Sequence, residues 1–572
     1  MTARELAVIA GALLLAGCAR TDAPTPAATT TAATATVASS EAYYGTLEPF
    51  ASHAVYFVVT DRFVNGDTSN DQRQQGGAQR TFDVPTPDAP AGESDNIGYL
   101  GGDFKGIADN AGYIRDMGFG AVWITPVVAN PDQAFTGGKP ITWGSSLTDR
   151  GKTGYHGYWG VNFYRLDEHL PSARLDFAGF TQAMHAQDLK VVLDIVGNHG
   201  SPAYTMPKPQ PMFGQIFDKD GKLIADHQNL PPAKLDPKHN PLHAFYNTGG
   251  GLAELSDFNE NNPAVLEYLL GAYEQWIGQG ADAFRIDTIG WMPDAFWHRF
   301  TTRIREKHPG FFMFGEAFDY NADKIANHTW PQNAGVSVLD FPLKQGLDEV
   351  FGRKQAGFER LREPLYLQNG PYANPYELMT FYDNHDMARM DASDEGFIDA
   401  HNWLFTARGI PVIYYGSETG FMRGRAEHAG NRNYFGQERI DAARGNPIRE
   451  RLKRIARLRA VTPALQRGLQ VNLELKGDRA AFYRVYQQAG QHQIALVLLN
   501  KGKAPARFEL RDVQPGLWHE AFSGRGVEVA EGAALAMDVQ PHDVQVLLLD
   551  APVSLPELRA QLSTAMAKAR RR

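Results

Sequence analysis

An arginine and a carboxylate at the end of an apolar stretch give the first chemical signal in this sequence. Residues 280–290 read GADAFRIDTIG, and the apolar residues fit a short, buried parallel strand that should end near Arg285 and Asp287. Side chains two residues apart lie on the same face of a strand, so Arg285 can keep Asp287 ionised. Asp287 is therefore a candidate nucleophile, and a structural salt bridge is the alternative.

Polar side chains follow three other predicted strands. They are Asp194, Asn198 and His199 near the end of the strand at 190–196, Glu316 at the end of 311–316, and His385 and Asp386 after 377–382. The carboxyl ends of parallel barrel strands meet at one mouth, where catalytic groups sit. These side chains can therefore converge on a single site.

Strand-like and helix-like stretches alternate in the part of the chain that carries these residues. Strands are predicted at 55–60, 120–126, 190–196, 280–287, 311–316, 336–341, 377–382 and 410–415, and helices at 107–117, 177–187, 263–279 and 294–307. Buried strands separated by crossover helices predict an α/β fold, a (β/α)8 TIM barrel. Residues 197–262 are too long for a simple loop and predict an excursion domain over the mouth.

Composition divides the chain further. The predicted segments are a lipoprotein-type signal peptide at 1–18, a disordered Ala/Thr/Pro tether at 19–45, a catalytic barrel at 46–460, an antiparallel β-sandwich at 461–550, and a helical or flexible tail at 551–572. The LAGC ending of the first segment resembles the bacterial lipoprotein signal, which implies lipidation of Cys18. An exported protein is expected, either anchored as a lipoprotein of the periplasm or cell surface, or secreted. An uncleaved anchor and a plain secretory signal remain the alternatives.

Charge and aromatic content narrow the class of ligand. The net charge is -9, which provides no basic patch for nucleic acid, and membrane contact is expected through a lipid anchor only. Aromatic residues make up 11% of the chain, and aromatic faces bind sugar rings by stacking. Residues 61–71 and 101–103 are rich in side-chain oxygens, which suits a calcium ion, although such residues also simply form turns.

The strand ends carry motifs that resemble those of the α-amylase family, glycoside hydrolase family 13. These are DIVGNH, FRIDTIG, FGEAF and FYDNHD, in that order, together with GYHGYW at 154–159 and LSDFN at 255–259. The resemblance covers roughly residues 55–550. It implies that Asp287 is the nucleophile, Glu316 the general acid/base and Asp386 the carboxylate that stabilises the transition state of a retaining glycosidase.

The same resemblance implies further binding residues. Substrate-binding residues would be His156, Tyr158, Trp159, His199, Arg285, His385 and Arg432. A structural Ca²⁺ would be bound between barrel and excursion domain by Asn198 and Asp257. A second Ca²⁺ near the N-terminal loop would be bound by Asn65, Asp67, Asn70, Asp71, Gly101 and Asp103.

The sequence departs from the family at the acceptor side. Gly290 and Trp291 replace a usual Lys-His pair, Ala253 stands near the place of an aromatic residue used in cyclisation, and the chain ends after one β-sandwich. These departures favour an α-amylase-type hydrolase of α-1,4-glucosidic bonds in starch, maltodextrin or related α-glucans. An α-glucan transglycosylase or cyclodextrin-active enzyme is the alternative, and a non-catalytic glucan-binding surface lipoprotein is a third hypothesis.

Overall fold

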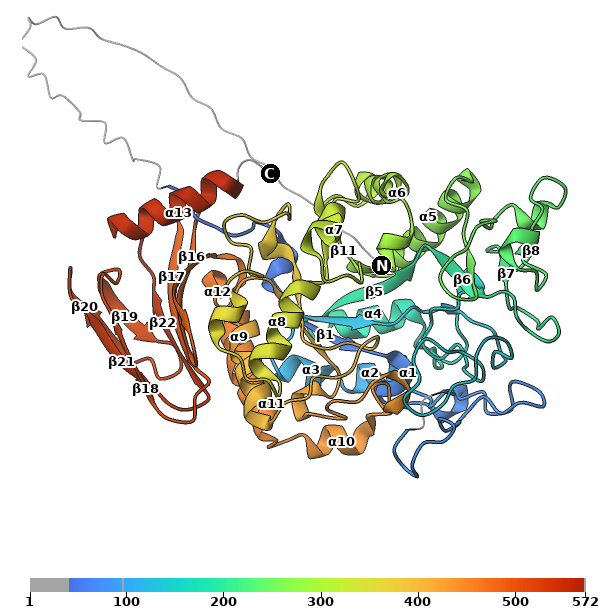
Figure 1. The fold of residues 1–572 in the computed structure, drawn as a ribbon, viewed down its shortest axis with the longest axis horizontal. Coiled ribbons are helices and arrows are strands. Elements are labelled where there is room, and N and C mark those ends of the chain that lie inside the picture. The colour runs from blue at the N-terminus through green and yellow to red at the C-terminus, as the bar shows by residue number, and fades with distance from the viewer. Residues whose placement is uncertain (1–40, 95–96, 570–572) are drawn as a thin grey trace, which may run out of the picture. The chain divides into compact units, whose positions relative to one another are not determined.

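The structure is a computed structural model that describes residues 41–94 and 97–569 (Figure 1). The predicted signal peptide, Cys18 and most of the predicted tether lie outside the described residues. Among the described residues, no helix is long and apolar enough to cross a membrane.

Eight parallel strands form the central sheet. They are β1 (Val55–Val58), β2 (Ala121–Ile124), β5 (Lys190–Val196), β10 (Ala283–Asp287), β11 (Phe312–Gly315), β12 (Ser337–Val338), β13 (Met379–Thr380) and β14 (Ile410–Tyr414). Their order is β12-β11-β10-β5-β2-β1-β14-β13, and a parallel bridge between Leu339 and Met379 joins the two outer strands. The predicted TIM barrel and all eight of its strands are confirmed.

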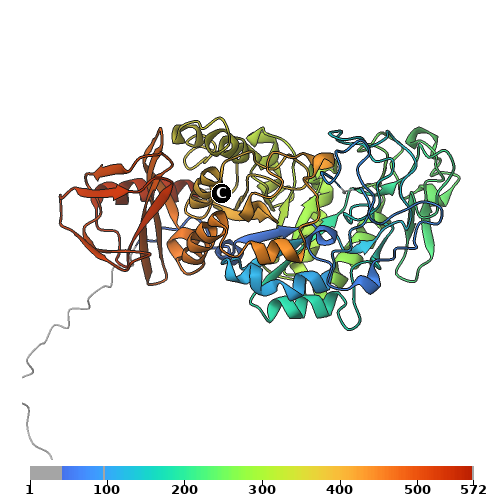
Figure 2. The ribbon, with the colours of Figure 1, turned by 90° about the horizontal axis from the view of Figure 1, so that it is seen from below.

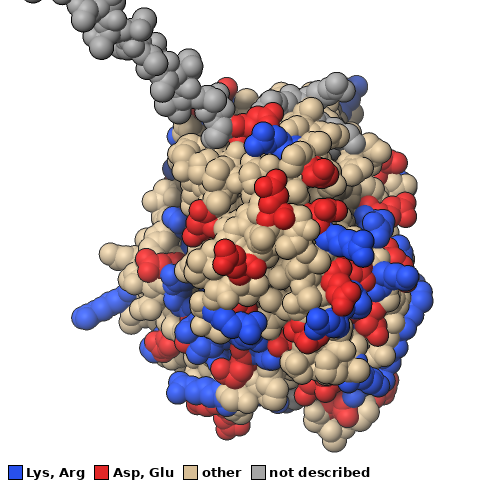
Figure 3. Space-filling view, turned by 90° about the vertical axis from the view of Figure 1, so that its left-hand side faces the viewer, with Lys and Arg blue, Asp and Glu red and all other residues tan. Residues whose placement is uncertain are grey.

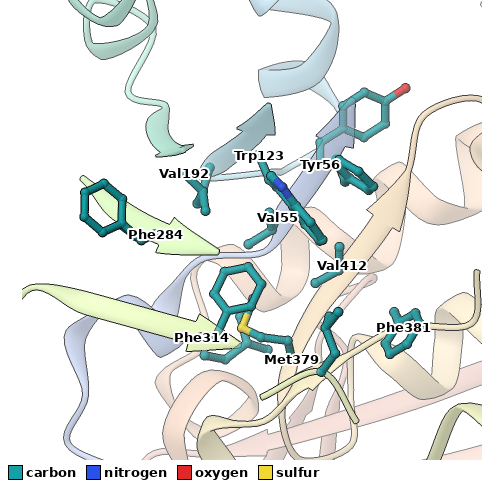
Figure 4. Close-up of a cluster of buried hydrophobic side chains, with 14 of the residues drawn as sticks. Val55, Tyr56, Trp123, Val192, Phe284, Phe314, Met379, Phe381 and Val412 are labelled. Atoms are coloured by element: carbon teal, nitrogen blue, oxygen red, sulfur yellow. The ribbon is translucent and has the colours of Figure 1, made fainter. Parts of the chain in front are cut away.

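Apolar side chains fill the inside of this barrel. The Trp123 ring stacks on Phe57 with centroids 3.8 Å apart and meets the edge of Phe314 at 5.4 Å. Side chains from several strands, including Val412 and Met379, converge on the same cluster (Figure 4). Burying each such side chain contributes roughly 1.5–3 kcal/mol, so the barrel interior is a packed core that holds the strand ends in place.

Helices surround the strands (Figures 1 and 2). They include α4 (Phe177–His185), α5 (Pro263–Gly278), α6 (Asp294–Lys307), α8 (Phe341–Phe351), α9 (Asp394–Leu404) and α11 (Pro447–Ala460). Helix α5 begins where Pro263 occupies the first turn and the Asn262 side chain accepts the Ala264 N–H. The single helix predicted at 107–117 is instead two helices, α2 (Phe104–Asp109) and α3 (Ala111–Asp116), separated at Asn110, whose side chain bonds back to the Gly106 carbonyl.

The excursion after β5 contains two small antiparallel pairs. Strand β6 (His199–Pro202) pairs with β9 (Leu255–Asp257), and β7 (Gln215–Phe217) pairs with β8 (Leu223–Asp226).

A second long connection, between β2 and α4, packs against this excursion, although the sequence drew attention only to the first. Phe135 and Trp159 from this connection share a buried cluster with Met206 and Phe213 from the excursion. The excursion is therefore built from two separate stretches of chain.

The C-terminal part is antiparallel. Its larger sheet has the order β15-β16-β17-β22-β19-β20, and β18 (Ala506–Leu510) pairs with β21 (Leu535–Val539) in a second sheet. The strands of the larger sheet are β15 (Leu469–Lys476), β16 (Arg479–Gln488), β17 (Gln491–Asn500), β19 (Gly516–Glu520), β20 (Gly526–Val529) and β22 (Asp543–Leu549). Figure 3 shows acidic and basic side chains interspersed on the face of the molecule that carries these sheets.

The last helix is more firmly held than its sequence indicates. The sequence favours a solvated, charged end after residue 551, but α13 (Pro556–Ala569) buries Leu558, Leu562 and Met566 in the core of the C-terminal sheets. These three residues have the i, i+4 spacing that places side chains on one helix face. The Ala-rich and Arg-rich composition hides this narrow apolar stripe.

Candidate active site

Arg285 lies at the centre of the predicted site. It is fully buried on β10, and its Nη1 lies 2.7 Å from Asp287 Oδ1 and 2.9 Å from Asp194 Oδ1. Its Nη2 lies 2.8 Å from Glu316 Oε1. One guanidinium therefore contacts three carboxyl groups that come from the ends of three neighbouring strands, β5, β10 and β11.

Asp194 faces the interior side of this cluster. Its Oδ2 accepts hydrogen bonds from Trp123 Nε1 at 3.0 Å and from the Tyr158 hydroxyl at 2.8 Å. Burial and the neighbouring charge of Asp287 raise the pKa of Asp194 to about 7, although Arg285 works in the opposite direction. Asp194 thus helps to fix Arg285 and Tyr158 in position.

The backbone turns sharply directly after Asp287. Thr288 has φ 47° and ψ 39°, a left-handed conformation that a β-branched residue rarely adopts. Such conformations cost roughly 1–3 kcal/mol and occur often at functional sites. Across this turn the Ile289 N–H donates to the Glu316 carbonyl and the Glu316 N–H donates to the Ile286 carbonyl, so the ends of β10 and β11 are held together.

Glu316 is placed to carry a proton. The residue is 4% exposed. Burial raises the pKa of Glu316 well above its usual value, and the negative charges of Asp386 and Asp287 raise it further, outweighing the opposite influence of Arg285. A carboxyl group kept neutral in this way can act as a general acid.

Asp386 has the opposite electrostatic character. Its carboxylate lies 2.8 Å from Arg432 Nη2 and 3.3 Å from His385 Nε2. Burial opposes ionisation, but the positive charges of Arg432 and Arg285 lower the pKa of Asp386 below its usual value. The site thus holds one carboxyl that favours the proton and one that favours the charge.

Two of the three predicted histidines, His199 and His385, lie beside these carboxylates, and the His156 ring stacks on Tyr158 with centroids 5.7 Å apart. His199 Nε2 is 4.0 Å from Asp287 Oδ2, and the His385 ring stacks on Tyr158 with centroids 5.3 Å apart. Burial lowers the pKa of all three histidines, that of His385 to about 3. The imidazoles of His156, His199 and His385 are therefore neutral hydrogen-bonding groups at ordinary pH.

Trp159 is a predicted substrate-binding residue whose ring packs away from the carboxylates. It is 3% exposed in the cluster with Phe135, and its ring meets the edge of His156 at 4.8 Å. Its position supports His156 from behind. The motif GYHGYW gave no sign of this difference between Tyr158 and Trp159.

A buried chain of alternating charges reaches the site from two loops, and Arg432 is its one member that was predicted as a site residue. Lys152 Nζ lies 2.7 Å from Asp149 and 3.0 Å from Glu427, and Glu427 lies 3.4 Å from Arg432. Burial alone would lower the pKa of Lys152, but Asp149 and Glu427 raise it above its usual value. The chain ends on Asp386 through Arg432, and no local sequence pattern signals it because its members are far apart in the chain.

The predicted ligands of the first calcium site lie side by side. Phe258, next to Asp257, donates its N–H to the Asn198 carbonyl, and His199 pairs with Asp257 across β6 and β9. Burial raises the pKa of Asp257 to about 6. The buried Asn198 Oδ1 has no hydrogen-bond partner, an acceptor left open for a cation.

The predicted second site is also compact. Asn65 and Asn70 each have a buried Oδ1 without a partner, and a Cβ placed on Gly101 would lie 2.2 Å from Asn65 Nδ2 and 2.6 Å from Asp71 Oδ1. Asp103 instead accepts backbone N–H groups, including that of Gly106 at 2.6 Å as the N-cap of α2.

Asp67 is the outermost of these predicted ligands, and its carboxylate accepts from Ser69. Within residues 41–94 and 97–569 there is no group of three or more His, Cys, Asp or Glu that could hold a metal. The open acceptors of Asn198, Asn65 and Asn70 fit a hard cation.

Comparison with known proteins gives a match to one family. The family described as alpha amylase, catalytic domain, matches residues 57–452. This chain belongs to the α-amylase family. A cyclomaltodextrin glucanotransferase from Klebsiella oxytoca is 28% identical over 502 residues, which cover 80% of this chain and 71% of that protein. An α-amylase from Niallia circulans is 29% identical over 463 residues, covering 79% of this chain and 81% of that protein.

A solved structure is similar to this chain over most of its length. That of CldA, described as a cyclomaltodextrin glucanotransferase with a three-domain ABC distribution, is 30% identical, covers 87% of this chain and 99% of that chain, and superposes with a TM-score of 0.69. The chain spans 60% to 71% of the length of seven curated glucanotransferases that it matches.

Proposed function

We propose that this α-amylase-family chain is a retaining glycoside hydrolase that cleaves α-1,4-glucosidic bonds in starch, maltodextrin or related α-glucans. The observation that carries the proposal is the sharing of Arg285 by Asp287 and Glu316. Because both carboxyls bind one guanidinium, they lie close together, as the roughly 5 Å separation of a retaining pair requires.

The roles follow from the two environments. Asp287, held by Arg285 Nη1, attacks the anomeric carbon, while Glu316 gives its proton to the leaving glycosidic oxygen. Water then enters, Glu316 removes its proton, and the bond to Asp287 breaks. Asp386, kept ionised by Arg432, binds substrate hydroxyl groups and stabilises positive charge at the ring.

Neutral histidines and a tyrosine complete the binding groups. His156, His199 and His385 can donate one hydrogen bond and accept another, which suits sugar hydroxyl groups. Tyr158 offers its ring beside His385 as a stacking surface.

An α-glucan transglycosylase is the second candidate, and two observations favour it. Similar proteins include cyclomaltodextrin glucanotransferases, and one of these has a three-domain ABC distribution, so a single C-terminal module does not favour hydrolysis. Against cyclisation stands Ala253, which offers no ring.

Product analysis over time from soluble starch, cyclodextrin and pullulan tests the proposal. Linear maltooligosaccharides from starch are expected. Cyclic or elongated products would contradict the hydrolase proposal and support the transglycosylase. The absence of any turnover would support the non-catalytic glucan-binding alternative.

We also propose two Ca²⁺ ions at the positions described above. The ions would supply positive charge to the open amide oxygens and tie the excursion and the N-terminal loop to the barrel. A ligand in hundredfold excess over its Kd stabilises a protein by about 2.7 kcal/mol, so EGTA should lower the melting temperature by several degrees, and Ca²⁺ should restore it. An unchanged melting temperature would contradict both proposed Ca²⁺ sites.

Export is a further proposal that rests on residues 1–18. With the full chain expressed in a bacterial host, Cys18→Ser should release the protein from the membrane fraction if Cys18 carries a lipid. If both forms are soluble, the secreted alternative is favoured, and if both stay in the membrane fraction, the uncleaved anchor is favoured.

A further inference from the structure

Three exposed aromatic side chains follow the strands that carry Asp287 and Glu316. Among the described residues, Trp291, Phe318 and Tyr320 are 55%, 55% and 43% exposed. Trp291 follows β10 and the other two follow β11, so all three come shortly after Asp287 or Glu316 in the chain. The Phe318 and Tyr320 rings lie together, with centroids 6.4 Å apart, and exposed apolar groups that cluster mark a binding surface.

Two of these rings are held from beneath. Phe318 and Tyr320 contact Phe341, which is fully buried at the start of α8, with centroids 4.8 Å and 5.8 Å away. The rings are thus fixed against the core and still open to water. A rigid ring loses little conformational entropy when a ligand stacks on it.

An open groove of about 720 Å³ continues from Tyr320. Residues 320–323, Glu363, Tyr366 and residues 369–371 line it. Tyr366 is half-buried against Tyr372, at a centroid distance of 5.5 Å. Two aromatic side chains, Tyr320 and Tyr366, therefore line the groove.

The charged residues of the groove indicate which class of ligand it can bind. Within the described part of the chain, neither Asp323 nor Glu363 forms an ion pair, and no lysine or arginine lines the groove. Carboxylates without a cation accept hydrogen bonds from hydroxyl groups and repel anions. Aromatic faces beside such acceptors suit a neutral, polyhydroxylated chain.

We propose that this groove binds a distant part of the same α-glucan chain that occupies the active site. The identity of the ligand rests on the proposed function. Continuity supports the assignment, because Tyr320 is four residues after Glu316, and four residues span at most about 14 Å. A long glucan can therefore reach both places, and a short one only the active site.

Binding measurements in the Glu316→Gln background test this inference. Maltoheptaose and maltotriose are titrated by calorimetry into the parent and into Tyr320→Ala. Loss of one stacking ring should weaken maltoheptaose binding by about threefold to tenfold and should leave maltotriose binding the same within twofold. Tyr320→Phe, which keeps the ring, should bind maltoheptaose as the parent does.

Two further variants separate the groove from general effects. Leu517→Ala, at an exposed position of the C-terminal sheet, should leave both affinities unchanged. Asp323→Ala removes a hydrogen-bond acceptor without touching the ring cluster, and should weaken maltoheptaose by about threefold even if Tyr320→Ala does not fold.

The outcomes distinguish this inference from the proposed function. Equal maltoheptaose affinity in the parent, Tyr320→Ala and Asp323→Ala would contradict glucan binding in the groove and would leave the proposed active site unaffected. Failure of the parent to bind either oligosaccharide would overturn both.

Discussion

Two fully buried arginines on opposite sides of the barrel face different numbers of carboxylates. Arg408 lies near one carboxylate, that of Asp340, and its other nitrogens donate to the carbonyls of Leu365 and Pro364. Arg285 contacts three carboxyl groups and has a fourth, Asp386, at 4.0 Å. The first arrangement is a neutral pair and the second has more acids than one cation can keep ionised.

The difference separates a structural ion pair from a reactive one. Around Arg285 the burial of several acids and their surplus of negative charge raise the pKa values of Glu316 and Asp194, and Glu316 is the one of these two that also faces Asp386. Around Arg408 no such surplus exists, so the charges contribute only to folding. A buried arginine–aspartate pair is thus weak evidence of catalysis when it stands alone. The ratio of acidic groups to cations distinguishes a structural pair from a reactive cluster.

Removing the proton carrier should give the largest effect. Glu316→Gln should lower kcat on starch by about 10²–10⁴-fold with little change in binding, because the amide cannot donate the proton. Glu267→Gln, at an exposed ion pair with Arg303, is the matched control and should keep full activity. Stopped assays of reducing ends measure both, and an active Glu316→Gln enzyme would refute the assigned role.

The pH dependence of activity tests the same role of Glu316 as a proton donor. Because the pKa of Glu316 is raised, the acid form should be lost, and activity should fall, as pH rises through it. With maltosyl fluoride, whose leaving group needs no proton, this basic limb should be absent. A basic limb of equal size on both substrates would assign it to another group.

Breaking the Arg408–Asp340 pair should lower the stability of the protein rather than its catalytic rate. Arg408→Met leaves Asp340 buried without its partner and should lower the free energy of unfolding by about 3–5 kcal/mol. Adding Asp340→Asn should recover much of this loss, since Asn can still cap α8 at the Leu343 N–H. Urea unfolding measures both variants, and kcat of the folded fraction should stay unchanged. A fall in kcat without a fall in stability would contradict the comparison.

The buried charge chain should give the smallest effect. Lys152→Met leaves Glu427 with Arg432 alone, which draws Arg432 away from Asp386 and raises the pKa of Asp386. The acid limb of kcat/KM should therefore move to higher pH, with about a tenfold loss at the optimum. Lys152→Arg should restore the profile.

Lys501→Met is the matched control for this variant. Lys501 is a buried lysine paired with Asp478 in the C-terminal part, far along the chain from the site. Its profile should match that of the unmodified enzyme, and a shift of the acid limb in Lys501→Met would mean that lost charge alone explains the result.

Local patterns in the sequence predicted much of this molecule. Each barrel strand is a short apolar run whose periodicity is visible in isolation, and Asp287, Glu316 and Asp386 follow directly from such runs. The apolar stripe of α13 was overlooked because it is only one residue wide in each turn.

Contacts between distant segments could not be predicted in the same way. Trp159 and Lys152 belong to the connection between β2 and α4, and their surroundings come from residues 206–213 and 427–432. Nothing near either residue in sequence distinguishes a side chain that faces substrate from one that supports another side chain. Only the folded chain separates these roles.

The seam of the barrel has a consequence for the electrostatics of the site. Strands β12 and β13 have two residues each, and the bridge from Leu339 to Met379 joins them. Glu316 follows β11 and Asp386 follows β13, so the seam lies between the strands that carry these two residues. The negative charge of Asp386, which raises the pKa of Glu316, therefore acts across the two shortest strands of the barrel.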